Sequence, residues 1–312
     1  MTQHSRVLAT LLAAVAVLTL TGPAFGWGFE GHRMILRMAI DLMPPGERAC
    51  LLGDDNFAVL ERNVVLPDQI AGLERNHKRP PEEGSRHYLN LEKMGKATDL
   101  DSFRRCLANQ SLKDGRLVSS LQETEGWLTR AARGNHRTEW LRRAAYLAHY
   151  VGDAHQPLHT TDNHDGRATD NAFDLDDPEG MSVHVRYESG LLNHYSKELE
   201  QRARDLAALY LSDHGGLRDE TARYQADPAA YVASFTWKTH QLVAQVLDTD
   251  NKLTGRRANF PMKSGKYYEK LNAALGEMTA QQLAQAAIAT AAMWKASAPA
   301  GEQAEKTWMF SR

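Results

Sequence analysis

Most of the chain after residue 26 repeats apolar residues at the spacing of an α-helix. Residues 31–43 show this pattern, and Pro44-Pro45 end it. The same spacing predicts helices over residues 100–108, 112–132, 139–155, 183–211, 229–247 and 278–295. Long alternating patterns typical of strands do not occur, and Val64-Val65 indicates only a short extended piece before Pro67. The sequence therefore predicts an all-α fold, with one multi-helix domain over residues 27–312.

Two segments are predicted as long loops, residues 58–90 and 160–182. Loops of this length in a compact domain usually build a functional site or are disordered. The second loop is rich in acidic residues: Asp162, Asp165, Asp170, Asp174, Asp176, Asp177 and Glu179. Their spacing differs from that of an EF-hand calcium loop, so we favour a solvated acidic loop over a calcium site.

The first 26 residues have the pattern of a secretory signal peptide. Arg6 precedes an apolar stretch too short to cross a bilayer comfortably, and Ala24 and Gly26 are small residues at the positions that a signal peptidase requires. A membrane anchor is the alternative. We expect cleavage after Gly26 and a secreted or periplasmic protein without a transmembrane segment. Cleavage would also give Trp27 a free α-amine that can act as a nitrogen donor.

Composition excludes some classes of protein and leaves the chemistry open. With 42% hydrophobic and 24% charged residues, the chain is neither disordered nor membrane-embedded by composition. A net charge of −2 argues against tight, charge-driven binding to a nucleic acid duplex. After the first 26 residues there are two cysteines, Cys50 and Cys106, for which a disulfide is left open. Neither belongs to a C-x-x-C pair, so any zinc must be held by nitrogen and oxygen.

The strongest chemical signal is the string from His149 to His159. His149 and Asp153 are four residues apart, so on a helix their side chains lie on the same face and can share one ion. Pro157 ends the regular helix and lets the following chain turn His159 toward a neighbouring metal. Because the surrounding residues are apolar, an unpaired histidine and aspartate would be costly to bury there.

A second pair has the same spacing: His184 and Glu188 are also four apart. A single pair of this kind is common on helix surfaces and would indicate only a modest helix contact. Two such pairs with His159 between them favour a metal site.

These motifs resemble the zinc-dependent phospholipase C and S1/P1 nuclease superfamily. The resemblance rests on His149-x-x-x-Asp153, Gln156-Pro157-Leu158-His159, the start Trp27-Gly28-x-x-Gly31-His32 and His184-x-x-x-Glu188, and it extends to about Leu192. It implies three zinc ions at the bottom of a cleft in a helical domain. One would bind Asp68, His87, His149 and Asp153, and one His159, His184 and Glu188. The third would bind the amine and carbonyl of Trp27, with His32 and a bridging Asp153.

The resulting expectation is hydrolysis of a phosphate ester by in-line attack of a zinc-bound hydroxide. Asp68 and Asp153 are the expected catalytic carboxylates, Asp68 orienting the water and Asp153 bridging two ions. A non-catalytic, zinc-stabilised protein that binds a partner through its acidic loop is kept as a different class. An obligate protein partner is not predicted. The remaining histidines are left out of the ligand set: His77, His136, His155, His164, His194, His214 and His240.

The sequence is divided on the substrate. The spacing from Trp27 to His32 and the long segment between His159 and His184 favour a nuclease for single-stranded nucleic acid. In that interpretation Tyr88 stacks on a base and Asn90 bonds to the base edge, although Tyr88 could equally be packing.

Glu188 in place of an aspartate, and Ala71 where the nucleases carry a basic residue, favour a phospholipase C acting on a phospholipid head group. A zwitterionic ester also fits the low net charge at least as well. The phospholipase C-like activity is therefore our main expectation, with the single-strand nuclease as the alternative.

Overall fold

The computed structural model describes residues 27–53, 55–78, 82–95, 97–108, 112–166, 182–255 and 265–297. These residues form helices and connecting loops without a strand, so the predicted all-α fold is confirmed. The longer helices are α2 (Gly28–Leu42), α3 (Pro45–Leu52), α4 (Asn56–Val64), α5 (Leu66–Asn76), α6 (Leu100–Leu107), α7 (Leu117–Arg133), α8 (Arg137–Ala154), α10 (Leu192–Asp213), α11 (Gly216–Ala226), α12 (Pro228–His240), α13 (Val243–Thr254) and α14 (Gly265–Ser297). Short helical segments are η1 (Gly84–His87), η2 (Leu91–Lys93), η3 (Leu112–Asp114), η4 (Pro157–Thr160), α9 (Val183–Val185) and the π-helical η5 (Arg186–Leu191).

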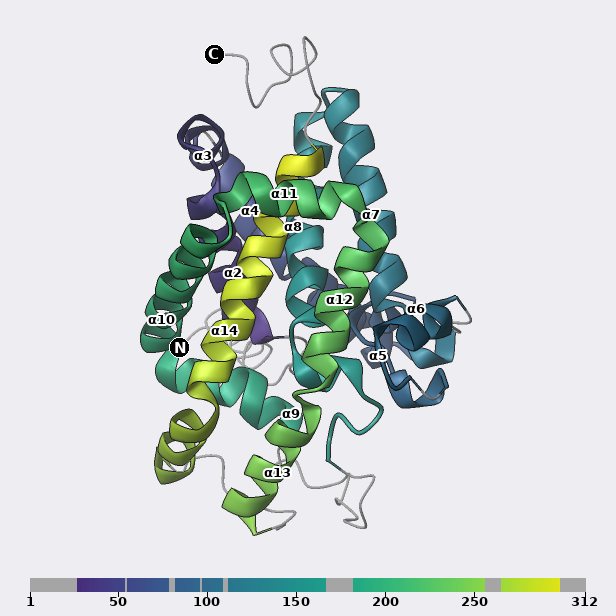
Figure 1. Ribbon diagram of the computed structural model, residues 1–312, viewed down its shortest axis with the longest axis vertical. Helices are drawn as coiled ribbons and strands as arrows, with labels where there is room; N and C mark the ends of the chain where they lie inside the picture. The colour runs from purple at the N-terminus through teal and green to yellow at the C-terminus, as the bar shows by residue number, and fades with distance from the viewer. Residues whose placement is uncertain are drawn as a thin grey trace, which may run out of the picture.

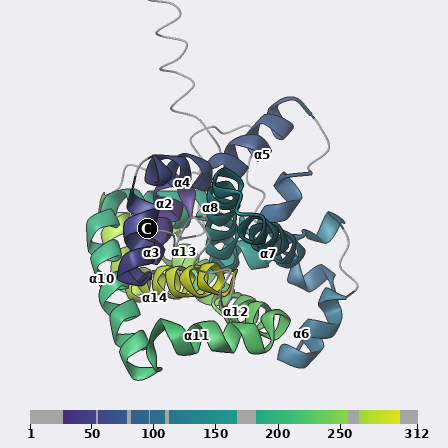
Figure 2. The ribbon, with the colours of Figure 1, turned by 90° about the horizontal axis from the view of Figure 1, so that it is seen from above.

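Helix α14 lies at the centre of the molecule and packs against α2, α8, α10 and α11 (Figures 1 and 2). It is buried on most of its sides, and alanines such as Ala280, Ala284 and Ala287 let several neighbours approach it closely. One hydrophobic cluster runs from Trp27 to Trp294 and includes residues of nearly every long helix. The described chain therefore forms one domain around one core.

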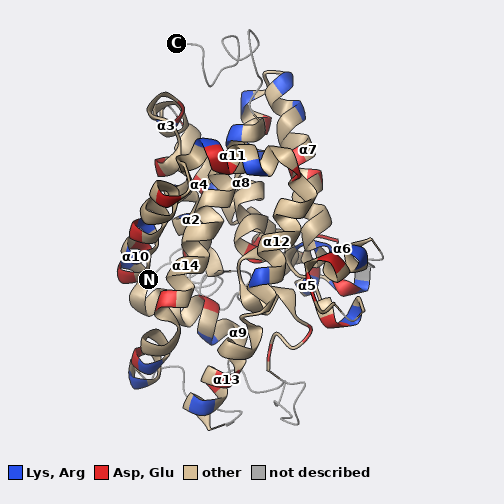
Figure 3. Ribbon diagram, viewed as in Figure 1, with Lys and Arg blue, Asp and Glu red and all other residues tan. Residues whose placement is uncertain are grey.

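Most Lys, Arg, Asp and Glu residues of the described chain are exposed or half-buried. In Figure 3 they mark α5, α6, α7 and α10, whereas the middle of α14 carries few. Within the described part of the chain, none of the helices is both long enough and apolar enough to span a bilayer.

Several predicted helices match the structure closely. Residues 31–43, 100–108 and 139–155 correspond to α2, α6 and α8. Residues 112–132 correspond to η3 followed by α7, and residues 183–211 to α9, η5 and α10 in succession. The predicted helix over 229–247 is instead two helices, because α12 ends at His240 in a turn before α13 begins. Helix α14 also begins earlier than the predicted residue 278.

The predicted loop over residues 58–90 is wrong. It contains the end of α4, all of α5 and η1, and Val64-Val65 is not extended. Pro67 stands in the first turn of α5, where a residue needs no hydrogen-bonding N–H, so it starts a helix here. Val65 alone joins α4 to α5. This arrangement places Asp68 in the first turn of α5, directly beside the end of α4.

Other sequence expectations fall partly outside the described residues. The predicted signal peptide, residues 1–26, lies there, as do Asp170, Asp174, Asp176, Asp177 and Glu179 of the acidic loop. Cys50 of α3 and Cys106 of α6 do not form a disulfide.

Candidate metal centre

Eight side chains expected to bind zinc come together from six parts of the chain. All are buried except His184, whose side chain is 16% exposed. They come from α2, α5, η1, α8, η4 and the adjoining α9 and η5: His32, Asp68, His87, His149, Asp153, His159, His184 and Glu188. Residues that are far apart in the sequence therefore lie together in one cluster. Their roles as metal ligands stay predictions.

The first group consists of Asp68, His87 and His149, joined by Asp153. His149 Nε2 lies 3.0 Å from His87 Nδ1 and 3.5 Å from Asp68 Oδ1. Asp153 Oδ2 lies 3.1 Å from His87 Nδ1 and 3.4 Å from His149 Nε2. In a tetrahedral zinc site with bonds of about 2.0–2.1 Å, neighbouring ligand atoms are roughly 3.3 Å apart. These four side chains therefore have the spacing of a zinc coordination shell.

The second group consists of His159, His184 and Glu188. Glu188 Oε2 lies 2.8 Å from His184 Nε2 and 3.6 Å from His159 Nε2, and the two imidazole nitrogens are 3.1 Å apart. Gln156 donates to the same carboxylate at 3.1 Å and so helps to fix it. Three protein ligands leave a fourth position of a zinc ion open. Glu188 stands in the π-helical segment η5, a feature often found at functional sites.

Asp153 connects these groups to His32. Its Oδ1 lies 3.5 Å from His32 Nε2 and 3.6 Å from His159 Nδ1, while its Oδ2 faces His87 and His149. The position is suited to a carboxylate that bridges ions. The His32 and His149 rings stack at 3.8 Å, and Gly152 permits this approach because a Cβ there would lie 3.0 Å from His32 Nδ1.

Trp27 immediately precedes α2, the helix that carries His32, and its buried ring packs against Tyr187. Its carbonyl oxygen accepts a hydrogen bond from the Gly31 N–H at 3.2 Å, which helps start α2. A second lone pair of that oxygen remains for a ligand. The role of its α-amine depends on cleavage after Gly26 and stays a prediction.

Several buried polar atoms of the cluster have no hydrogen-bond partner among the described residues, and their chemistry indicates which kind of ligand could bind there. Both ring nitrogens of His32, both oxygens of Asp68, Asp153 Oδ1 and Glu188 Oε1 are buried and have no hydrogen-bond partner within the described ranges. Leaving a buried polar atom unsatisfied costs free energy, and native structures rarely tolerate several together. Imidazole nitrogen and carboxylate oxygen are ligands that zinc accepts. The side chains present therefore fit divalent metal ions.

Electrostatics also favour the metal-binding protonation states of most of the ligands. Burial lowers the pKa of His32 to about 4 and that of His149 well below its usual value, so both rings are neutral at pH 7. Burial opposes ionisation of Asp153, but His149 and His159 keep the pKa of that carboxyl below its ordinary value. Burial opposes the charged form of His87 as well, yet Asp153 and Glu83 raise its pKa to about 10. A metal ion must therefore displace a proton from His87.

Backbone carbonyls set the tautomers of two candidate ligands, His149 and His159. His149 Nδ1 donates to the Val64 carbonyl oxygen at 2.7 Å, and His159 Nδ1 donates to the His87 carbonyl oxygen at 2.5 Å. In each ring the lone pair of Nε2 is then directed into the cluster. Such outer contacts orient metal ligands and fix which nitrogen binds.

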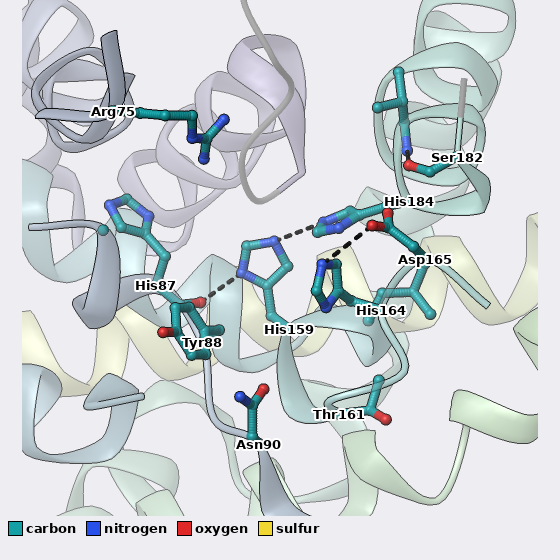
Figure 4. A pocket seen from close by; sticks show the side chains of 13 residues that line it. Arg75, His87, Tyr88, Asn90, His159, Thr161, His164, Asp165, Ser182 and His184 are labelled. Atoms are coloured by element: carbon teal, nitrogen blue, oxygen red, sulfur yellow. Dashed lines mark hydrogen bonds and ion pairs between the residues drawn. The ribbon is translucent and has the colours of Figure 1, made fainter. Parts of the chain in front are cut away.

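A pocket of about 530 Å³ opens beside the second group (Figure 4). His87, His159 and His184 reach its wall, and the two predicted substrate residues, Tyr88 and Asn90, line it. Tyr88 is half-buried, so its ring is both held by packing and open to the pocket.

Arg75 also lines this pocket, and sequence reasoning missed it (Figure 4). It follows Asp68 by seven residues in α5, which is two helical turns and so the same face. Because this segment was predicted as a loop, the shared helix face of Asp68 and Arg75 could not be recognised. The cation absent at Ala71 is thus supplied one turn later.

The excluded histidines behave differently from one another. His155 stacks on Phe235 and donates to the Val151 carbonyl oxygen at 2.8 Å, in agreement with a packing role. His164 lies closer to the site than expected, since it and Asp165 form a group with His184 at the pocket rim. The other excluded histidines belong to none of the metal-binding groups found among the described residues: His77, His136, His194, His214 and His240.

Comparison with known proteins agrees with this geometry. Residues 27–298 match the family described as S1/P1 Nuclease. The chain is also similar to Endonuclease 1 of Arabidopsis thaliana, with 26% identity over 154 residues that cover 48% of this chain and 48% of that protein. The matched family region includes every residue of the cluster, from His32 to Glu188. The chain therefore belongs to the S1/P1 nuclease family.

Proposed function

We propose that this protein is an exported, zinc-dependent nuclease that hydrolyses phosphodiester bonds in single-stranded nucleic acid. The observation that carries the proposal is the contact between the candidate metal centre and a pocket lined by Tyr88, Asn90 and Arg75. An aromatic ring, an amide and a guanidinium are the groups that bind a base face, a base edge and a phosphate. The family match and the endonuclease relative support the same substrate class.

This conclusion corrects our main expectation from the sequence, which was a phospholipase C-like activity. The comparisons favour the alternative, the nuclease. One sequence argument for phospholipase C was the neutral Ala71, and Arg75 weakens it because a cation is present in the pocket. Glu188 fits either activity, since an aspartate and a glutamate offer the same ligand atoms.

Three zinc ions are proposed, one for each group of ligands, the third also using the α-amine of Trp27. Bound zinc would supply positive charge for the phosphoryl oxygens and acidify water. The carboxylate of Asp68 accepts a hydrogen bond from the attacking water, and Asp153 keeps neighbouring ligands at fixed separations. Tyr88 and Asn90 hold an unstacked base, and this requirement selects a single strand over a duplex.

Export after cleavage at Gly26 is part of the proposal, and the start of the family match at residue 27 supports it. In that case Trp27 is the first residue of the mature chain.

The test uses the processed chain with three substrates: single-stranded DNA, the same sequence as a duplex, and phosphatidylcholine vesicles. We expect rapid hydrolysis of the single strand, slow hydrolysis of the duplex, loss of both after chelation and recovery with zinc. Hydrolysis of phosphatidylcholine alone would restore the phospholipase interpretation. Zinc binding without hydrolysis of any substrate would favour the non-catalytic class.

A further inference from the structure

The candidate metal ligand His87 has a carboxylate, that of Glu83, on the side that faces away from the cluster. The family resemblance gives Glu83 no role. His87 directs Nδ1 into the cluster, 3.1 Å from Asp153 Oδ2 and 3.5 Å from Asp68 Oδ1. Its other nitrogen, Nε2, points the opposite way and lies 3.7 Å from Glu83 Oε1, within ion-pair range. His149 and His159 have neutral backbone carbonyls at the corresponding place. His87 therefore differs from these two in having an anion behind it.

Glu83 is itself held from several sides. The Tyr150 hydroxyl donates a short hydrogen bond to Glu83 Oε1, and Arg86 Nε lies 4.0 Å from its Oε2. The side chain is only 14% exposed, so its charge is poorly screened by water.

The backbone that carries Glu83 is anchored to the helix that carries Asp68. The carboxylate of Glu74, in α5, accepts hydrogen bonds from the Glu83 N–H at 2.9 Å and the Gly84 N–H at 3.0 Å. Tyr150 follows His149 in α8, and its ring packs edge-on against His87 with centroids 5.7 Å apart. The contacts around Glu83 therefore connect three elements that supply ligands of one group.

We infer that Glu83 is a positioning residue for the metal ligand His87, forming with Tyr150 a carboxylate–imidazole pair that fixes the ring and raises the basicity of Nδ1. The inference rests on the proposed metal site and is independent of the substrate. Partners of this kind typically contribute about 10–100-fold to metal affinity. The ion held by Asp68, His87 and His149 should be the one that depends on Glu83, whereas the ion at His159, His184 and Glu188 should not.

The test compares Glu83→Gln with the neighbouring Glu82→Gln, which makes the same chemical change on an exposed side chain. Zinc release from the loaded protein is measured by titration with a chromophoric chelator. In Glu83→Gln we expect one zinc equivalent to be released about 10–100-fold more readily, with the others unchanged. Tyr150→Phe, which leaves the carboxylate in place, should shift the same equivalent by a smaller factor.

Thermal unfolding of the zinc-free proteins separates positioning from a structural role. We expect Glu83→Gln and Glu82→Gln to melt together without zinc and to differ once zinc is bound. Equal zinc release from the two variants would overturn the inference, and so would an equal loss of stability in Glu83→Gln with and without zinc. Either result leaves the proposed nuclease activity standing, because the wild-type chain is assayed on single-stranded DNA separately.

Discussion

The segment from His184 to Glu188 contributes to two different sets of buried polar and charged groups. Arg186 belongs to an ion pair, and His184 and Glu188 belong to the candidate metal centre. Arg186, between His184 and Glu188, pairs with Asp250 in two hydrogen bonds of 2.9 and 2.6 Å, and Tyr267 donates to the same carboxylate at 2.5 Å. Both charges of this pair are satisfied within the protein. The candidate metal centre beside it instead contains buried oxygens and nitrogens that have no hydrogen-bond partner among the described residues.

The difference shows how one helical segment can serve both stability and chemistry. The Arg186 side chain points to Asp250 and Tyr267, whereas His184 and Glu188 point to the cluster. The ion pair needs nothing from outside, and a buried pair of this kind fixes how α13 and α14 meet η5. The cluster has no such internal partner for several of its polar atoms, so we expect it to take up cations from solution. The predictions below test this contrast, beginning with the largest expected effect.

The largest effect is expected for Asp153→Asn. Both oxygens of this carboxylate face other ligands, so the substitution should disturb more than one ion. We expect hydrolysis of single-stranded DNA to fall by more than about 100-fold, beyond the loss typical of an outer partner, and zinc content to fall with it. Glu188→Gln, which affects the second group alone, is the matched comparison and should be milder. Full zinc content in Asp153→Asn would contradict the bridging role.

Breaking the ion pair should cost stability without any dependence on zinc. Asp250→Ala removes the carboxylate that balances the buried charge of Arg186, and we expect the free energy of unfolding to fall by about 3–5 kcal/mol. The measurement is chemical denaturation with and without zinc. If the loss were much larger in one condition than in the other, the two sets of charges would not be independent.

The buried His155 gives a prediction for pH. Burial lowers its pKa to about 4 in the folded protein, against about 6.5 in the unfolded chain. Between these values the unfolded state binds more protons, so stability rises with pH. The contribution is fully present above pH 6.5 and is lost as pH falls toward 4. Its loss between pH 7 and 4.5 amounts to about 2 kcal/mol.

The check is chemical denaturation of the zinc-free wild type and of His155→Phe at both pH values. The variant should lose about 2 kcal/mol less than the wild type between pH 7 and 4.5. Parallel loss in the two proteins would show that His155 is not the group responsible.

The smallest effect is expected for Arg75→Ala. Removing this cation from the pocket should raise KM for single-stranded DNA by about 10-fold, the worth of one charge-assisted hydrogen bond, with little change in kcat. Arg62→Ala, an exposed arginine on α4 outside the pocket, is the control. A change in kcat as large as that in KM would indicate that Arg75 acts in the chemical step rather than in binding.

The cluster itself could be found from the sequence because its strongest signals are local. His149 and Asp153 lie one turn apart in α8, and His184 and Glu188 stand at the same spacing. Spacing along a helix translates directly into a shared face. The more distant ligands, such as Asp68 and His87, came from the family resemblance, since no local pattern marks them.

Arg75 and Glu83 could not be found in this way. Both lie in residues 58–90, which were predicted as a loop, whereas α5 begins there at Leu66 with Pro67 in its first turn. Arg75 faces the pocket because it lies two helical turns after Asp68 on the same face of α5, and this face can be inferred only once the helix is recognised. Glu83 reaches His87 through a tertiary arrangement with Tyr150, which single-sequence patterns do not encode.

The same reasoning explains the errors in the fold. Helix α11 was missed because most of its side chains are polar or charged, with an apolar pattern too weak to register. The break between α12 and α13 was missed for the opposite reason, since apolar residues continue through the turn at Gln241 and Leu242. The first half of α14 was missed although exposed Lys266, Glu269 and Lys270 alternate there with buried Tyr267, Tyr268 and Leu271.

Metal analysis of the purified chain tests the central claim most directly. The cluster should retain zinc through extensive dialysis, with three ions in a chain that begins at Trp27 and two in a chain with residues added ahead of it. A chain that folds, keeps its Arg186–Asp250 pair and binds no zinc in either form would contradict the account.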